Sequence, residues 1–269
     1  MQKILLIGGG NMGQALVKGW LRQEMNAHHI LVVDPHISDA FAHELPNIHI
    51  VKHLDLTPTD FHPDALVLAV KPQAMADVLR PLKALPRQPG VYLSIAAGKT
   101  LASFALALGD DAPVVRAMPN TPAAIGRGMS VACPNTQVAP SSRALCDRLL
   151  SAVGEVAWID DESLLDAVTA VSGSGPAYVF LLIESMAAAG IAAGLPEPLA
   201  LQLARITVDG AGELARRLDI SPAQLRQNVT SPNGTTQAAL EILMSNEGLP
   251  ALMRRAVMAA TRRSRELAG

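Results

Sequence analysis

The sequence of 269 residues has few aromatic side chains, few cysteines and little net charge. Aromatic residues make up 3% of the chain, and 22 basic residues stand against 24 acidic ones, which gives a formal net charge of −2. Nucleic acids are bound by cationic surfaces and by stacking on aromatic rings, so this composition argues against a nucleic-acid partner. Two cysteines, Cys133 and Cys146, cannot form a disulfide framework or a zinc site by themselves.

The second half of the chain also lacks two residue types that carry out acid-base chemistry. The lysines and histidines all lie before residue 100, so the second half cannot supply a lysine or histidine acid for ketone reduction or alcohol oxidation. The histidines crowd before residue 63 without metal-ligand spacing, and we expect no metal site. The lysines are Lys3, Lys18, Lys52, Lys71, Lys83 and Lys99, and the histidines are His28, His29, His36, His43, His49, His53 and His62.

Targeting and membrane segments are not indicated either. The N-terminal residues lack the charged region, long apolar run and cleavage site of a signal peptide, which favours a cytoplasmic protein. The longest apolar stretch, residues 177–195, is about as long as a membrane span of roughly 20 residues. Glu184 lies near its middle, and the sequence offers no matching second span. We expect a soluble helix buried against its own chain and against a second subunit, with a membrane helix as the alternative.

What is present in the first half is an alternation of short β-branched or aliphatic runs with helix-like stretches. This alternation is typical of βαβ units and predicts an α/β fold with a mostly parallel sheet. After Asp160 and Asp161 the strand-like runs stop, and the remaining sequence predicts helices alone. We therefore divide the chain into domains of residues 1–160 and 161–269. The expected strands are residues 4–7, 30–33, 48–51, 65–70, 91–95, 114–117, 129–133 and 156–159.

A glycine motif follows the first strand and opens a helix. The pattern G-x-G-x-x-G at this place binds the pyrophosphate of a dinucleotide, because the glycines allow a tight turn, close approach of the ligand and close packing of helix on strand. Asp34 ends the second strand 21 residues after Gly13 (34 − 13 = 21), near the distance of about 20 for a ribose-binding acid. The alternative is a purely structural glycine turn. The motif is Gly8-Gly9-Gly10-Asn11-Met12-Gly13.

Asp34 bears on the choice between NADH and NADPH. Its carboxylate is expected to accept a hydrogen bond from a ribose hydroxyl and to repel a 2′-phosphate, and residues 35–39 contain no arginine to hold that phosphate. The hypothesis is therefore a preference for NADH. Further cofactor contacts are expected where other strands end, at Ala69, Val70, Lys71, Ala96, Ala97 and Asn120, although ordinary strand-to-helix turns are an equal alternative for the small residues.

Two loops rich in small residues open helices in the second half. They contain Ser174 and Gly175 in the first loop, and Ser231, Asn233, Gly234, Thr235 and Thr236 in the second. Free backbone N–H groups at a helix N-terminus suit a small carboxylate, although helix capping alone is the simpler interpretation of either loop. A protonated C=N bond needs no strong general acid to accept hydride, so the missing lysines and histidines favour imine reduction.

With these motifs together, the sequence resembles the pyrroline-5-carboxylate reductase family over essentially its whole length. The resemblance is carried by the glycine motif, by residues 69–72, 118–122, 171–178 and 229–236, and by Gly190 and residues 194–196. It implies a Rossmann-type doubly wound domain followed by an all-helical dimerisation domain, and hydride transfer from NADPH or NADH to the cyclic imine 1-pyrroline-5-carboxylate to give L-proline. It also implies a homo-oligomer whose active sites are shared between subunits.

The resemblance also assigns roles to individual residues. It places the substrate carboxylate on the backbone of Ser231, Gly234 and Thr235 and directs the hydroxyl of Thr236 to the ring nitrogen. Ser174 and Gly175 match positions beside the nicotinamide and the substrate. The chain departs from the family pattern in having Asn233 where a glycine is usual, and asparagine tolerates the left-handed conformation better than most residues.

Two other functions remain as alternatives. A β-hydroxyacid dehydrogenase would have the same fold, but its usual lysine in the helical domain is missing here. A non-catalytic NAD-binding oligomer that acts as a redox sensor or scaffold would need no carboxylate-binding loop. The intact loop of residues 231–236 favours the enzyme over the sensor.

Overall fold

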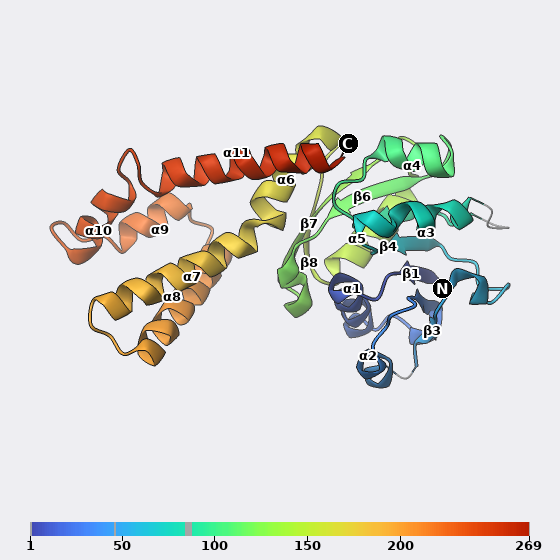
Figure 1. The fold of residues 1–269 in the computed structure, drawn as a ribbon, viewed down its shortest axis with the longest axis horizontal. Helices are drawn as coiled ribbons and strands as arrows, with labels where there is room; N and C mark the ends of the chain where they lie inside the picture. The colour runs from blue at the N-terminus through green and yellow to red at the C-terminus, as the bar shows by residue number, and fades with distance from the viewer. Residues whose placement is uncertain (1, 46, 84–87, 269) are drawn as a thin grey trace. The chain divides into compact units, whose positions relative to one another are not determined.

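The structure is a computed structural model that describes residues 2–45, 47–83 and 88–268. Close contacts divide the chain into two compact units. The sheet unit contains Met1–Gly173 together with Thr261–Gly269, and the helical unit contains Ser174–Ala260. Figure 1 labels the helices and strands of both units. The division at residue 160 that the sequence suggests remains a prediction, because contacts alone do not define a functional domain.

The sheet unit is built on one mostly parallel sheet, as predicted. Its strand order is β3-β2-β1-β4-β5-β6-β7-β8, in which only the described pair β6 and β7 runs antiparallel. Aliphatic residues of the strands are buried on both faces of the sheet, which is typical of parallel strands covered by helices. The strands are β1 (Ile4–Ile7), β2 (Ile30–Val33), β3 (His49–Val51), β4 (Ala65–Leu68), β5 (Tyr92–Ser94), β6 (Val114–Met118), β7 (Gly128–Pro134) and β8 (Gly154–Trp158).

Helices cover both faces of this sheet (Figure 1). α1 (Asn11–Arg22) and α5 (Pro140–Ser151) enclose one core with alternate residues of β1 and β2, and α3 (Met75–Leu82) and α4 (Leu101–Leu108) enclose the other. The short α2 (Asp39–Glu44) was not predicted, because six residues are too few for a clear apolar period. The strand order reverses between β1 and β4, and ligands bind at such a switch point, beyond the carboxyl ends of the strands.

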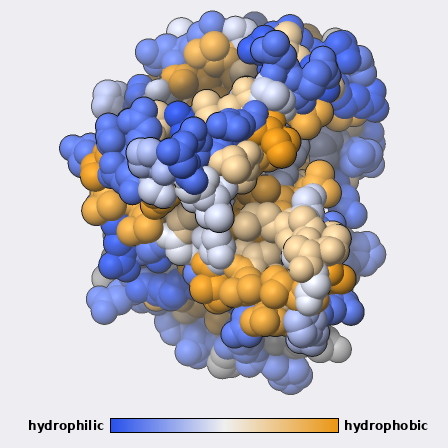
Figure 2. All heavy atoms as spheres, turned by 90° about the vertical axis from the view of Figure 1, so that its left-hand side faces the viewer, coloured by the Kyte–Doolittle hydropathy of each residue, from blue (hydrophilic) through white to orange (hydrophobic). Residues whose placement is uncertain are grey.

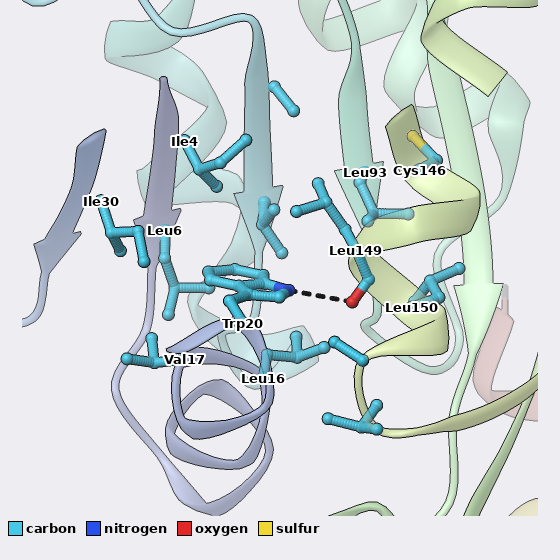
Figure 3. Close-up of a cluster of buried hydrophobic side chains, with 14 of the residues drawn as sticks. Ile4, Leu6, Leu16, Val17, Trp20, Ile30, Leu93, Cys146, Leu149 and Leu150 are labelled. Atoms are coloured by element: carbon cyan, nitrogen blue, oxygen red, sulfur yellow. Dashed lines mark hydrogen bonds between the residues drawn. The ribbon is translucent and has the colours of Figure 1, made fainter. Parts of the chain in front are cut away.

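Trp20 is the largest side chain in the first of these cores. It is fully buried between residues of β1 and α5, and its Nε1–H donates to the Leu149 carbonyl at 2.9 Å (Figure 3). That carbonyl lies in the last turn of α5, where carbonyls lack partners within the helix. The indole therefore fills the core and also satisfies a helix end.

We expect Trp20→Phe to lower the free energy of unfolding by about 2–3 kcal/mol, because a buried carbonyl loses its donor and a cavity forms. Urea titration measures the loss. Trp158→Phe is the matched control: Trp158 also donates through Nε1, but to the partly buried Asp147 at 2.8 Å, and we expect a loss of less than about 1 kcal/mol. Equal losses in the two variants would contradict this role for Trp20.

The helical unit consists of helices alone, as predicted for the second half. α7 (Gly175–Ala192) and α8 (Glu197–Arg217) form a pair (Figure 1), followed by α9 (Pro222–Asn228), α10 (Thr235–Leu243) and the greater part of α11 (Leu249–Ala268). Pro196 and Pro222 stand at or next to the helix starts they were expected to mark. α7 and α8 pack closely, and Gly190 leaves room for Ala200.

Much of this unit's apolar surface is exposed in the single chain. In α7, Ala187 is buried, whereas Phe180 is 58% and Leu181 is 61% exposed. Figure 2 views the side on which α7 to α10 are drawn, and apolar residues gather there between hydrophilic ones. By length and composition residues 162–192 could span a membrane, and 6% of their most apolar window is buried. Such a surface is usually covered by a protein partner or a membrane.

Candidate active site

A pocket of about 660 Å³ opens at the carboxyl ends of β1, β2 and β4, all within the sheet unit. Its size is typical of a small-molecule site. Six of the residues predicted to bind a cofactor line it, and all come from loops that follow these three strands. They are Gly8, Gly10, Asp34, Ala69, Val70 and Lys71.

Three of the four glycines of the motif are required for different structural reasons. Gly8 has a φ of +106°, and a Cβ there would lie 2.6 Å from the Ala69 carbonyl oxygen. A Cβ on Gly13 would lie 2.1 Å from the Gly8 carbonyl oxygen, so Gly13 lets α1 approach the strand. Gly10, the N-cap of α1, has nothing within 4 Å of its ideal Cβ and no side-chain cap. An open, uncapped helix start suits a pyrophosphate.

Glycine substitutions separate these reasons. We expect Gly8→Ala to lower the free energy of unfolding by at least about 2 kcal/mol, because it combines positive φ with a clash against backbone. Gly10→Ala fits the protein and is expected to leave stability unchanged, but to raise the Kd for NADPH at least about tenfold, since its methyl group occupies the open space. Thermal unfolding and calorimetric titration measure the two effects. A Gly10→Ala protein that binds NADPH normally would contradict the assignment.

Asp34 is held by the backbone around it. Its Oδ2 accepts from the Gly9 N–H at 2.5 Å, and its Oδ1 accepts from the His36 N–H at 2.7 Å. The carboxylate therefore fastens the glycine loop to the turn after β2. Four pocket residues near it, His36, Lys52, His53 and Leu54, were not predicted as cofactor residues. Lys52 could have been found because it follows β3 just as Asp34 follows β2.

Other predicted cofactor residues lie outside this pocket. Asn11, Met12 and Gly13 form the first turn of α1, and Ala96 and Ala97 follow β5. Asn120 follows β6; its Nδ2 donates to the carbonyl and to the hydroxyl of Ser172, each at 3.2 Å, and its Oδ1 accepts from the Met129 N–H at 2.9 Å. Within the sheet unit Asn120 thus ties the end of β6 to the segment before Ser174.

That segment, Thr169–Gly173, is a π-helix. Sequence reasoning did not predict it, because a π-turn has no strong residue pattern, although such turns are frequent at functional sites. A Cβ on Gly173 would lie 2.5 Å from the Met118 methyl group, so the segment is closely packed. Gly175 begins α7 with open space at its Cβ, and Ser174 makes no capping hydrogen bond through its side chain.

The second small-residue loop begins α10 in the helical unit. Asn233 has a φ of +58°, the left-handed conformation that its position was expected to need. Its N–H donates to Gln237 Oε1 at 2.8 Å, and the Gly234 N–H donates to the Ser231 carbonyl at 3.1 Å. Gly234 is the N-cap, and no side chain caps the helix. The first N–H groups of α10, including those of Thr235 and Thr236, thus stand at a positive helix end.

The two cysteines are buried, and the described residues hold no cluster of metal ligands. Burial raises the pKa of Cys146 to about 12, and burial, followed by the charge of Glu162, raises the pKa of Cys133. Both thiols stay protonated at neutral pH. Among the described residues no three His, Cys, Asp or Glu side chains are grouped as metal ligands. No metal role is assigned to any residue.

The sheet topology and the glycine-lined pocket define a Rossmann-type dinucleotide-binding protein. Residues 3–98 match the family model described as NADP oxidoreductase, coenzyme F420-dependent, and residues 162–267 match that for pyrroline-5-carboxylate reductase dimerisation. A pyrroline-5-carboxylate reductase of Pseudomonas aeruginosa is 43% identical over 99% of this chain and 97% of its own, and one of Pisum sativum is 37% identical over 97% and 94%.

Solved structures agree with these relatives. A pyrroline-5-carboxylate reductase from Coxiella burnetii superposes with a TM-score of 0.92 at 34% identity, covering 100% of this chain and 99% of that one. A pyrroline carboxylate reductase from Plasmodium falciparum with NADP bound superposes at 0.84 with 28% identity, covering 100% and 98%. The chain belongs to the pyrroline-5-carboxylate reductase family, and it is an oxidoreductase of proline biosynthesis that reduces 1-pyrroline-5-carboxylate with NAD(P)H.

Proposed function

We propose that the loop of residues 231–236 binds the substrate carboxylate and that the Thr236 hydroxyl hydrogen-bonds the ring nitrogen. The observation that carries this proposal is the uncapped N-terminus of α10, preceded by the left-handed Asn233. A carboxylate there would accept from backbone N–H groups and gain from the helix dipole. In this arrangement Ser231, Asn233, Gly234 and Thr235 hold the carboxylate end of the ring.

Ser174 and Gly175 complete the proposed substrate site. The Ser174 hydroxyl makes no capping hydrogen bond and is available to a ligand, and Gly175 keeps space open at the start of α7. The clamp of Asn120 on Ser172 fixes the chain two residues before Ser174. We assign Ser174, with Thr236, to the catalytic positions.

The nucleotide is assigned to the pocket of the sheet unit. The N-terminus of α1, with Gly8, Gly10, Asn11, Met12 and Gly13, would hold the pyrophosphate, and Asp34 would lie toward the adenosine ribose. Residues of the later strand ends, Ala69, Val70, Lys71, Ala96, Ala97 and Asn120, would lie toward the nicotinamide. When bound, NAD(P)H supplies the hydride that the C=N carbon accepts.

The residues of the chain act mainly by placement. A protonated imine already carries the proton that its nitrogen keeps in the product, so the site needs no strong acid and only has to orient the ring. The helical half has no lysine or histidine to act as one. A hydroxyl at the nitrogen and N–H groups at the carboxylate fix two ends of the substrate.

The functional protein is proposed to be a cytoplasmic homo-oligomer. The exposed apolar face of α7 supports a second copy as its cover, because the dimerisation model matches this region. We infer that each active site combines the nucleotide domain, residues 1–160, of one subunit with helices from residues 161–269 of its partner. Nucleic acid and membrane are not expected partners, since the net charge is −2 and a second copy accounts for the apolar helix.

An absorbance assay tests the function directly. NADPH or NADH is followed at its absorption band with and without 1-pyrroline-5-carboxylate, and the expected result is oxidation that requires the imine. A β-hydroxyacid with the oxidised nucleotide is the control for the related dehydrogenase chemistry and is expected to give no signal. Nucleotide binding without imine-dependent oxidation would favour the non-catalytic sensor instead.

A further inference from the structure

Lys52 lies beside Asp34 at the edge of the nucleotide pocket. Strands β2 and β3 are parallel with Val33 opposite Val51, and the Asp34 N–H continues the ladder by donating to the Val51 carbonyl at 3.0 Å. The register therefore brings Lys52, the next residue of the chain, alongside Asp34. Both side chains line the pocket.

The carboxylate of Asp34 is already engaged by the protein. Each of its oxygens accepts a backbone N–H, from Gly9 and from His36. The two N–H dipoles offset part of the field of the negative charge, and the Asp34 carboxylate joins the glycine loop to the turn after β2. The Asp34 carboxylate consequently repels a neighbouring phosphate less strongly than its position after β2 suggests.

Of the two lysines among the described lining residues, Lys52 is the one that follows the strand next to β2. Lys71 follows β4, on the far side of β1, and the acidic Asp77 is paired with Arg80 at 3.3 Å. Lys52 is exposed and has no ion-pair partner among the described side chains. His36 and His53 also line this pocket, and an imidazole N–H can donate to a phosphate oxygen.

We propose that Lys52, with His36 and His53, forms a subsite for the 2′-phosphate of NADPH and gives the chain a preference for NADPH over NADH. A phosphomonoester carries about −1.5 to −2 charges at pH 7, and a lysine ammonium binds it as a point charge. This reverses the preference inferred from Asp34 and residues 35–39, because the cation comes from the neighbouring strand. The proposal rests on the assignment of this pocket to the nucleotide.

Two small probes isolate the 2′-phosphate. Calorimetric titration of the full chain compares 2′,5′-ADP with 5′-AMP, which differ by that phosphate. Because a hydrogen bond between charged groups adds roughly tenfold in affinity, 2′,5′-ADP is expected to bind about tenfold more tightly, and Lys52→Gln is expected to remove the difference. For the whole cofactors, Lys52→Gln should raise the Kd of NADPH about tenfold and that of NADH by less than about twofold.

Lys71→Gln is the matched control, since it removes the same charge from the same pocket and is expected to weaken both cofactors equally. Equal affinity for the two probes, or equal weakening of NADPH and NADH by Lys52→Gln, would overturn the subsite while leaving the pocket as the nucleotide site. If neither Lys52→Gln nor Gly10→Ala changes the binding of any nucleotide, the subsite and the pocket assignment both fail.

Discussion

Thr236→Ala is expected to lower kcat/KM for 1-pyrroline-5-carboxylate roughly 100-fold while leaving the Kd of NADPH unchanged. The lost hydroxyl acts on the ring nitrogen as the C=N bond is reduced, so its removal affects the transition state and not the nucleotide. Thr236 stands at the second position of α10, after the uncapped Gly234, and the helix does not depend on its side chain for a cap. The fold is therefore expected to survive.

Thr236→Ser is the matched variant, because it restores the hydroxyl and removes only a methyl group. We expect it to recover most of the activity. Steady-state kinetics with both substrates and calorimetric titration of NADPH measure the effects. Full turnover by Thr236→Ala would remove Thr236 from the mechanism, and an equal loss in Thr236→Ser would show that packing, not the hydroxyl, matters at this position.

The second large effect is expected from a charge on the exposed face of α7. Phe180→Glu places a carboxylate on a side chain that is 58% exposed in the single chain and, by the proposal, buried against a second copy. An unpaired charge in such an interface costs several kcal/mol, so the protein is expected to become monomeric in sedimentation. A monomer cannot complete a shared site, and activity is expected to fall at least about 100-fold.

Leu106→Glu is the control for this substitution. Leu106 belongs to α4 in the sheet unit and is 87% exposed, so the same change there is expected to leave the assembly and the activity intact. A Phe180→Glu protein that remains oligomeric and active would contradict the interface. A stable monomer that keeps full activity would contradict the shared site.

The strands and long helices could be predicted because they are set by local patterns. The aliphatic run Ile4–Ile7 and the six residues 8–13 after it already specify strand, turn and helix. A proline caps the start of α8, and another is the first residue of α9. The expectation that Asn233 could replace a glycine was also met, since its φ is +58°. These features depend on the conformations that single residues prefer.

What could not be predicted depends on contacts between distant parts of the chain. The end of α11, from Thr261 onward, belongs again to the sheet unit, and there the Ser264 hydroxyl donates to the Asp166 carboxylate at 2.6 Å. No local sequence pattern predicts that the last helix packs on the first unit. The position of Lys52 directly after β3 was a local signal, but its place beside Asp34 depends on the register of β3 on β2. Pairings of this kind are set by tertiary structure, which overrides local sequence.

The central claim is that the loop of residues 231–236 and the nucleotide pocket together place the imine for hydride transfer. A crystal structure of the assembled protein with NADP⁺ and L-proline tests it most directly. The account predicts the proline carboxylate on the N–H groups at the start of α10 and its nitrogen about 3 Å from the Thr236 hydroxyl oxygen, with the ring against the nicotinamide. Proline bound away from this loop, or a lysine or histidine at its nitrogen, would contradict the account.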